Sequence, residues 1–139
     1  MAAVFNVHIL AADRALYEGP CESLIVPLLQ GQYGVLARHS NMIGAVVPGK
    51  LTFRTPDGET QIAAVSAGMV KIENNDVLVL VDSAERPDEI DINRAKRAEA
   101  EAKEAILQQR SRQEYLAAQA NLARAINRLR VKSRYTIGR

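Results

Sequence analysis

The sequence contains no tryptophan, two phenylalanines and one cysteine in its 139 residues. With so few aromatic side chains, it has no obvious platform on which nucleic-acid bases could stack. The single cysteine, Cys21, excludes a disulfide within the chain, and we interpret it as a small, half-buried strand residue. Together with His8 and His39, it does not reproduce the spacing of zinc ligands.

Charge and hydropathy exclude further classes of protein. The net charge is +2, which by itself implies neither nucleic acid nor an acidic membrane as a partner. No apolar run approaches the roughly 20 residues that span a bilayer. The N-terminus lacks the basic leader and the cleavage region of a signal peptide. We therefore expect a soluble protein that works where it is made, most simply in a cytoplasm.

The first part of the chain has the period of β-strands. Residues 4–10 alternate, so that Phe5, Val7 and Ile9 share one side. The apolar run at 22–29 contains Pro27, which suits an edge strand or a bulge.

Turn residues join the strands that follow. Thr55-Pro56-Asp57-Gly58 is typical of a turn, and Asn74 and Asn75 tolerate the left-handed conformation of a second hairpin turn. Two glycines within 31–42 predict another hairpin, followed by a surface loop. Short strands at regular spacing favour an antiparallel β-sandwich or small barrel over residues 1–86.

The second part of the chain has a helical composition. It follows a polar linker at 83–89, and from Ile90 to Val131 it contains neither glycine nor proline. Ser111 and Glu114 fit a capping box, which indicates a second helix start. We predict helices at about 90–109 and 112–131, packed antiparallel across a short turn. The fold class is therefore α+β, with the sandwich followed by a two-helix hairpin over residues 87–139.

The seam between the predicted helices is rich in alanine. Its positions are Ile92, Ala95, Glu99, Ala102 and Ile106 on the first helix, and Tyr115, Ala118, Leu122, Ala125 and Leu129 on the second. Alanine buries little apolar area. The hairpin should be marginal alone and able to rearrange, although a permanently docked hairpin fits the sequence as well.

Three arginines are predicted to share one edge of this hairpin. With antiparallel helices and about 100° of rotation per residue, Arg94, Arg124 and Arg128 converge. Like charges held close together are unfavourable unless an anion neutralises them. Asp91 could neutralise one charge, and a phosphate chain near the N-terminus of the first helix could neutralise more. Alternatively, Asp88 or Asp91 only caps the helix and the arginines are solvated.

The order of the segments carries a resemblance to a known family. GQYGVLARH at 31–39 looks like that family's Gly-x-x-Gly-Val-Leu…His motif. AVSAGMVKIENNDVLVLVDSAERPDEID at 64–91 is similar to the segment that closes its sandwich. In this order, the chain resembles the epsilon subunit of the bacterial F-type ATP synthase along essentially its whole length. It departs at Gln32, where the family often has an acid, and at Ala37-Arg38, where Pro-Gly is common.

The resemblance implies a non-catalytic central-stalk subunit of a proton-translocating rotary motor. The sandwich would bind the gamma subunit and the ring of c subunits, with Gln32 and His39 in the contacting region. The hairpin would either fold down on the sandwich or extend along gamma toward the alpha and beta subunits, where it impedes ATP hydrolysis. The chain would then lie peripherally at the cytoplasmic face of a bacterial plasma membrane and would require no cofactor.

Some members of the family bind ATP on the folded hairpin, and the resemblance implies ATP as a regulatory ligand here. Their Ile/Leu-Asp-x-x-Arg-Ala motif stands at residues 90–95. The positions implied to contact the nucleotide are Glu85, Ile90, Asp91, Arg94, Ala95, Arg124 and Arg128. Because no glycine-rich phosphate loop is present, we interpret the site as a sensor rather than an NTPase.

The C-terminus is basic, because no acid follows Glu114. Arg130, Lys132 and Arg134 form either a solvated tail or a surface that steers an acidic partner, which in the family would be a helical segment of the beta subunit. Three competing functions remain. They are a purely structural stalk subunit, a nucleic-acid-binding barrel, which the near-neutral charge disfavours, and an enzyme, for which a catalytic set is missing.

Overall fold

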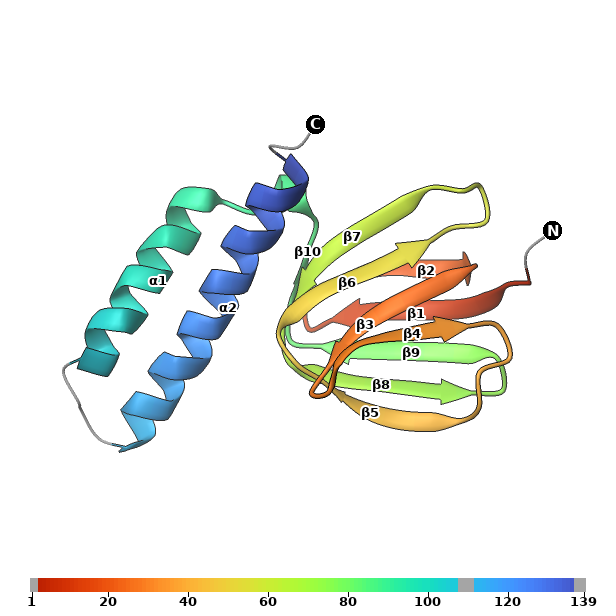
Figure 1. The fold of residues 1–139 in the computed structure, drawn as a ribbon, viewed down its shortest axis with the longest axis horizontal. Helices are drawn as coiled ribbons and strands as arrows, with labels where there is room; N and C mark the ends of the chain where they lie inside the picture. Colours follow the sequence, from red (N-terminus) through yellow and green to blue (C-terminus); the bar gives the residue numbers. More distant parts are fainter. Residues whose placement is uncertain (1–2, 108–111, 137–139) are drawn as a thin grey trace. The chain divides into compact units, whose positions relative to one another are not determined.

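The structure, a computed structural model, describes residues 3–107 and 112–136, with side chains from 116 to 133 in the second range. The chain divides into two compact units, Met1–Arg86 and Pro87–Arg139, which are described separately. Strands build the first unit and two α-helices the second (Figure 1), which confirms the predicted α+β class. No helix in the described part is long and apolar enough to cross a membrane.

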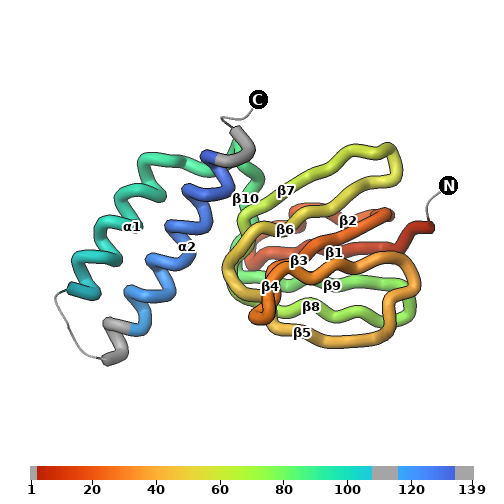
Figure 2. The backbone as a smooth tube through the Cα atoms, viewed as in Figure 1, coloured from red at the N-terminus to blue at the C-terminus, as the bar shows by residue number. Residues whose placement is uncertain are grey.

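Ten strands build the first unit within the described residues. They are β1 (Phe5–Ala11), β2 (Ala15–Cys21), β3 (Ser23–Leu28), β4 (Gly31–Leu36), β5 (Met42–Val46), β6 (Gly49–Arg54), β7 (Thr60–Val65), β8 (Gly68–Glu73), β9 (Asp76–Val81) and β10 (Ala84–Glu85). Their order is β10-β7-β6-β3-β5-β8-β9-β1-β2, and β4 pairs with β3 outside this path. Strands β1 and β9 lie side by side in parallel, although they are far apart in sequence (Figure 2).

The predicted alternation positions the core of the first unit. Phe5, Val7 and Ile9 are buried, as their shared side of β1 required. They join one apolar cluster with residues of β3 and β6, such as Leu24 and Phe53. The predicted turns are also confirmed, because β6 and β7, like β8 and β9, pair as antiparallel hairpins. Burying this cluster, at about 25 cal/mol per Å² of apolar area, is the main driving force for the sandwich.

Pro27 does not lie on an edge strand or at a bulge, so that prediction was wrong. Strand β3 pairs with β4 along its length in a regular register. On its other side it pairs with β6 up to Ile25 and with β5 at Leu28. Pro27 lies where one partner gives way to the other, so its missing N–H costs no ladder bond. Its carbonyl accepts a hydrogen bond from the N–H of Val47 at 3.0 Å.

The second unit contains a 3-10 turn, η1 (Pro87–Glu89), and the helices α1 (Ile92–Leu107) and α2 (Arg112–Thr136). The predicted linker at 83–89 therefore holds β10 and η1. Helix α1 starts two residues later than predicted, and α2 runs past the predicted end at 131, because the sequence has no glycine or proline until Gly138.

The alanines of the predicted seam are buried, whereas its other described positions are half-buried. Ala95 and Ala102 of α1 and Ala118 and Ala125 of α2 are at most 6% exposed. Figure 1 shows the two helices packed side by side. The predicted capping box at Ser111 and the seam position Tyr115 lie outside the described side chains.

Candidate functional site: the linker end of the helical hairpin

Asp91 is the N-cap of α1. Its Oδ1 accepts hydrogen bonds from the backbone N–H groups of Asn93 at 3.0 Å and Arg94 at 3.1 Å. These are two of the four donors that a helix start leaves without an internal partner. Ile90 before the cap and Ala95 in the first turn are both buried, at the spacing of a hydrophobic staple. The sequence left Asp88 and Asp91 as alternatives, and the structure selects Asp91.

The cap changes the predicted anion site. A phosphate at the start of α1 could not take the N–H groups of Asn93 and Arg94, because Asp91 already accepts from them. The Asp91 carboxylate also offsets the partial positive charge of the helix start. Any phosphate site here must therefore depend on arginine side chains rather than on the helix N-terminus.

A hydrogen bond at the same end joins α2 to the turn before α1. Lys132 Nζ donates to the carbonyl oxygen of Pro87 at 3.0 Å, which ties the C-terminal part of α2 to η1. This contact brings α2 to the turn before α1 but does not fix which residues of the two helices are level. The level of Arg94 relative to Arg124 and Arg128 stays a prediction from helix periodicity. The sequence could not predict the contact between Lys132 and Pro87, because it depends on the fold of the linker.

The three arginines differ in environment. Arg94 is exposed, and its side chain makes no hydrogen bond or ion pair with the residues that the structure describes. Arg124 is half-buried and donates to Oδ1 of Asn121 one turn earlier in α2. Arg128 is also half-buried, and its Nε atom is buried. Their common level on the hairpin and their convergence on a ligand both stay predictions.

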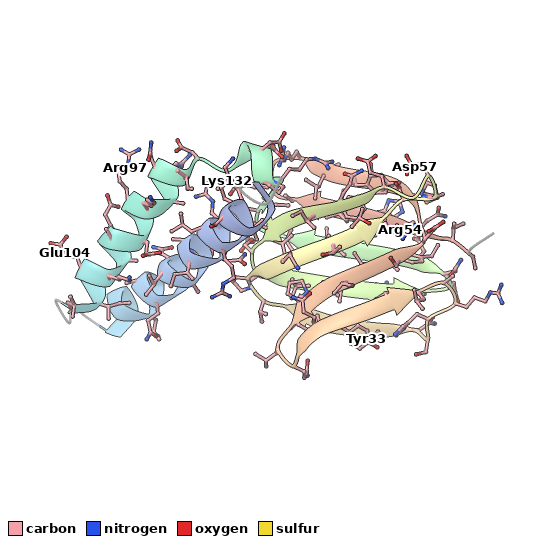
Figure 3. All side chains as sticks on the ribbon, turned by 45° about the horizontal axis from the view of Figure 1, so that its top comes forward. Tyr33, Arg54, Asp57, Arg97, Glu104 and Lys132 are labelled. Atoms are coloured by element: carbon pink, nitrogen blue, oxygen red, sulfur yellow. The ribbon has the colours of Figure 1, made fainter. Side chains whose placement is uncertain are left out.

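Positive side chains gather at the linker end of the hairpin. Arg97 on α1 and Lys132 on α2 mark this end in Figure 3, whereas Glu104 lies nearer the other end of α1. Helix α1 has no acidic residue in its first turn and no basic residue in its last. Arg94 in this first turn opposes the helix dipole, whereas the Asp91 cap and the two acidic residues of η1 agree with it.

The remaining residues of the predicted nucleotide site lie in different units. Ile90 and Ala95 belong to the hairpin, where burial makes both of them part of its interior. Glu85 is the last residue of β10, in the first unit, and is half-buried. Within the described residues, no group of three or more histidine, cysteine or acidic side chains could hold a metal ion.

The two predicted partner-contact residues lie in and after β4. Gln32 is exposed, and its Nε2 lies 3.5 Å from the carbonyl oxygen of Lys50. His39 Nδ1 donates to the carbonyl of Ser40 at 2.7 Å, so Nε2 is left to accept from the Tyr33 hydroxyl, also at 2.7 Å. The His39 ring is therefore held in one orientation beside Tyr33.

The predicted basic tail is only partly a solvated surface. Arg130 is exposed, as a steering surface requires. Lys132 is half-buried and donates to Pro87. The side chain of Arg134 lies outside the described residues.

Both units match known protein families. A family described as "ATP synthase, Delta/Epsilon chain, beta-sandwich domain" matches residues 4–87. A second, "ATP synthase, Delta/Epsilon chain, long alpha-helix domain", matches residues 88–133. The ATP synthase epsilon chain of Caldanaerobacter subterraneus is 36% identical over 135 residues, which cover 97% of this chain and 98% of the relative. This chain belongs to the ATP synthase epsilon chain family.

Other relatives agree with this assignment. The ATP synthase epsilon chain of Ruminiclostridium cellulolyticum is 39% identical over 132 residues, which cover 95% of this chain and 98% of the relative. The predicted resemblance and the prediction of a non-catalytic subunit are thereby confirmed.

Solved structures share the fold. A chain of the Euglena gracilis mitochondrial ATP synthase, solved with OSCP, F1 and c-ring, superposes with a TM-score of 0.79 at 19% identity. The superposition covers 91% of this chain and 80% of that one. A chain from the central stalk and c-ring of the Tetrahymena thermophila enzyme gives 0.66 at 13% identity, covering 94% and 98%.

Proposed function

We propose that this chain is a central-stalk subunit that couples the gamma subunit to the c-ring, and that its hairpin restrains ATP hydrolysis and binds ATP. Family membership supports the stalk role, as do the similar folds found in complexes that contain a c-ring or a central stalk. Gln32 and His39 are the proposed contacts with gamma and the c-ring. In the complex, the chain lies peripherally at the cytoplasmic face of a bacterial plasma membrane, next to alpha and beta through its extended hairpin.

The observation that carries the ATP proposal is the set of cationic side chains at the linker end of the hairpin. Arg94 is exposed, and its charge has no partner among the described residues. Helix periodicity predicts that it lies at the level of Arg124 and Arg128. Arg94, the one cation in the first turn of α1, also costs stability against the helix dipole. A polyphosphate would offset both costs, because guanidinium groups present several donors to phosphate oxygens.

The remaining implied residues take supporting roles in this proposal. Asp91 orders the first turn of α1 and so fixes the backbone of Arg94, while buried Ile90 and Ala95 hold that turn against the hairpin. For Glu85, the last residue of β10, the contact with ATP rests on the family resemblance alone. ATP can favour one position of the hairpin only as far as it binds that position more tightly.

Calorimetric titration of the full chain with ATP tests this site. Arg94→Ala should weaken ATP binding at least about tenfold, because it removes a charge-assisted contact of about 1.5–3 kcal/mol. Lys96→Ala is the matched control, since Lys96 is exposed on the same helix about 200° away from Arg94. Absence of heat up to millimolar ATP, or equal loss in both variants, would overturn the ATP proposal and leave a structural stalk subunit.

A further inference from the structure

Strand β4 has one edge that pairs with no other strand in the described part of the chain. It is bonded to β3 over Gly31–Leu36, and the strand order continues from β3 to β6 and β5 without it. Figure 3 shows β4, which carries the labelled Tyr33, at the margin of its sheet beside β3. The outer edge of β4 is therefore open to another chain.

The register identifies which backbone groups face outward. The Pro27 carbonyl of β3 bonds to Val47, so it points away from β4. Pro27 is opposite Gln32. Because the Pro27 carbonyl points away from β4, this is a non-hydrogen-bonded position, at which both residues direct their N–H and C=O groups away from each other. With no register shift along β4, the N–H and C=O groups of Gln32, Gly34 and Leu36 all face outward. No described residue forms a hydrogen bond with these groups.

This edge lacks the usual protection against pairing with other chains. Natural edge strands carry charges, prolines or bulges that block pairing. The sequence of β4, GQYGVL, has no charged residue and no proline, and its pairing with β3 has no bulge. A Cβ at Gly31 or Gly34 would meet no atom within 4 Å, and Leu36 is 65% exposed, so the faces of β4 at these positions are uncovered. Strand β4 itself therefore offers neither charge nor bulk against an added strand.

We propose that an extended, uncharged segment of a neighbouring subunit adds to β4 as a further strand when this chain joins its complex. The inference rests on the proposed stalk function, and it specifies how the region of Gln32 and His39 makes contact. Neutrality of β4 and the exposed Leu36 fit a segment without charges. Backbone hydrogen bonds would then provide affinity and the exposed side chains selectivity.

Hydrogen exchange at single residues tests this pairing, in the free chain and in the complete complex. The amides of Gln32, Gly34 and Leu36 should exchange quickly in the free chain and become protected in the complex. Those of Tyr33 and Val35, which face β3, should be protected in both. Unprotected outer amides in the complex would overturn the proposal, as would protection that rises with concentration of the free chain, since that indicates pairing between copies.

Two substitutions at Gln32 distinguish the contribution of its backbone N–H to binding from that of its side chain. Gln32→Pro removes the outward N–H, whereas Gln32→Ala keeps it. Binding to a complex prepared without this subunit should be about fivefold to tenfold weaker for the proline variant than for the alanine variant. Equal binding would contradict strand addition. If the unmodified chain itself fails to join the complex, the stalk function fails instead.

Discussion

Lys132 and Pro87 join the two ends of the hairpin through a hydrogen bond of 3.0 Å. The bond holds the C-terminal part of α2 against η1. Lys132 was also predicted to act in the basic surface that meets an acidic partner. While the hairpin is closed, Pro87 occupies one of the three donors of the Lys132 ammonium, and that donor is not available to such a partner.

Lys132→Met should loosen the hairpin, because methionine keeps an apolar stem but removes the donor. We expect a loss of about 1 kcal/mol, seen as roughly fivefold faster amide exchange in the turn of α2 around this position. Lys96→Met on the exposed side of α1 is the control and should change nothing. If both variants exchange like the unmodified chain, the Pro87 contact does not hold the hairpin closed.

Arg130→Gln should act differently from Lys132→Met in the assembled motor. Arg130 is exposed, so its loss should relieve inhibition of ATP hydrolysis without loosening the hairpin. Neutralising Arg130, Lys132 and Arg134 together should relieve inhibition further. The measurement is the hydrolysis rate of the reassembled complex, and an unchanged rate for the triple variant would refute a role for the basic tail.

Asp91→Ala should destabilise the hairpin whether or not ATP is present, because it removes the N-cap of α1. The expected cost is about 0.5–2 kcal/mol. Asp91→Asn should keep most of that stability, since asparagine caps about as well as aspartate. Thermal unfolding of the helical signal compares the two variants. An equal loss in both would show that the carboxylate charge, and not the cap, holds the first turn.

The features that sequence could predict are local ones. Alternation placed Phe5, Val7 and Ile9 in the core, and the paired asparagines predicted a left-handed turn, which has φ values of 51° at Asn74 and 64° at Asn75. The position of Pro27 was not predictable in this way, because it depends on which strand β3 meets on each side.

The candidate site likewise combines features that the sequence could predict with features that it could not. The position of Asp91 in the sequence made it a possible N-cap. Choosing it over Asp88 required knowing where α1 begins, which only the structure shows. Helix periodicity and an antiparallel hairpin predict the level of Arg94 between Arg124 and Arg128, and this stays a prediction. The Lys132–Pro87 bond and the open edge of β4 could not be predicted, because each depends on segments that meet only in the folded chain.

Gly68→Ala should unfold or strongly destabilise the sandwich. A Cβ at this position would lie 1.9 Å from the carbonyl oxygen of Leu80 and 2.7 Å from Cα of Val81, both of them backbone atoms that cannot move aside cheaply. We expect a loss of about 3 kcal/mol or more. Gly34→Ala is the control, because nothing lies near its Cβ. Denaturant unfolding of both variants measures the difference, and similar stability would contradict this packing.

His8 should make the sandwich slightly more stable at mildly acidic pH. Its Nδ1 lies 3.1 Å from Oε1 of Glu18 and its Nε2 3.3 Å from Oδ1 of Asp76. The hydrogen bond to Glu18, with further attraction from Asp76, raises the pKa of His8 above 6.5. This stabilisation is complete below the unfolded pKa and is lost as pH rises through the folded pKa.

His8→Gln should remove this pH dependence. Because the side chain is 37% exposed, the effect is a few tenths of a kcal/mol. Denaturant midpoints at pH 5.5 and pH 8.5 measure it, and titration of the His8 ring by NMR gives the direction of the pKa shift. A folded pKa below that of the unfolded chain would contradict the two contacts.

ATP hydrolysis by the complex, reassembled with the full chain or with a chain that ends at Arg86, tests the regulatory role of the hairpin most directly. Both chains should assemble, because the sandwich carries the proposed contacts with gamma and the c-ring. We predict severalfold faster hydrolysis with the shortened chain. Equal rates in two equally assembled complexes would contradict a regulatory hairpin.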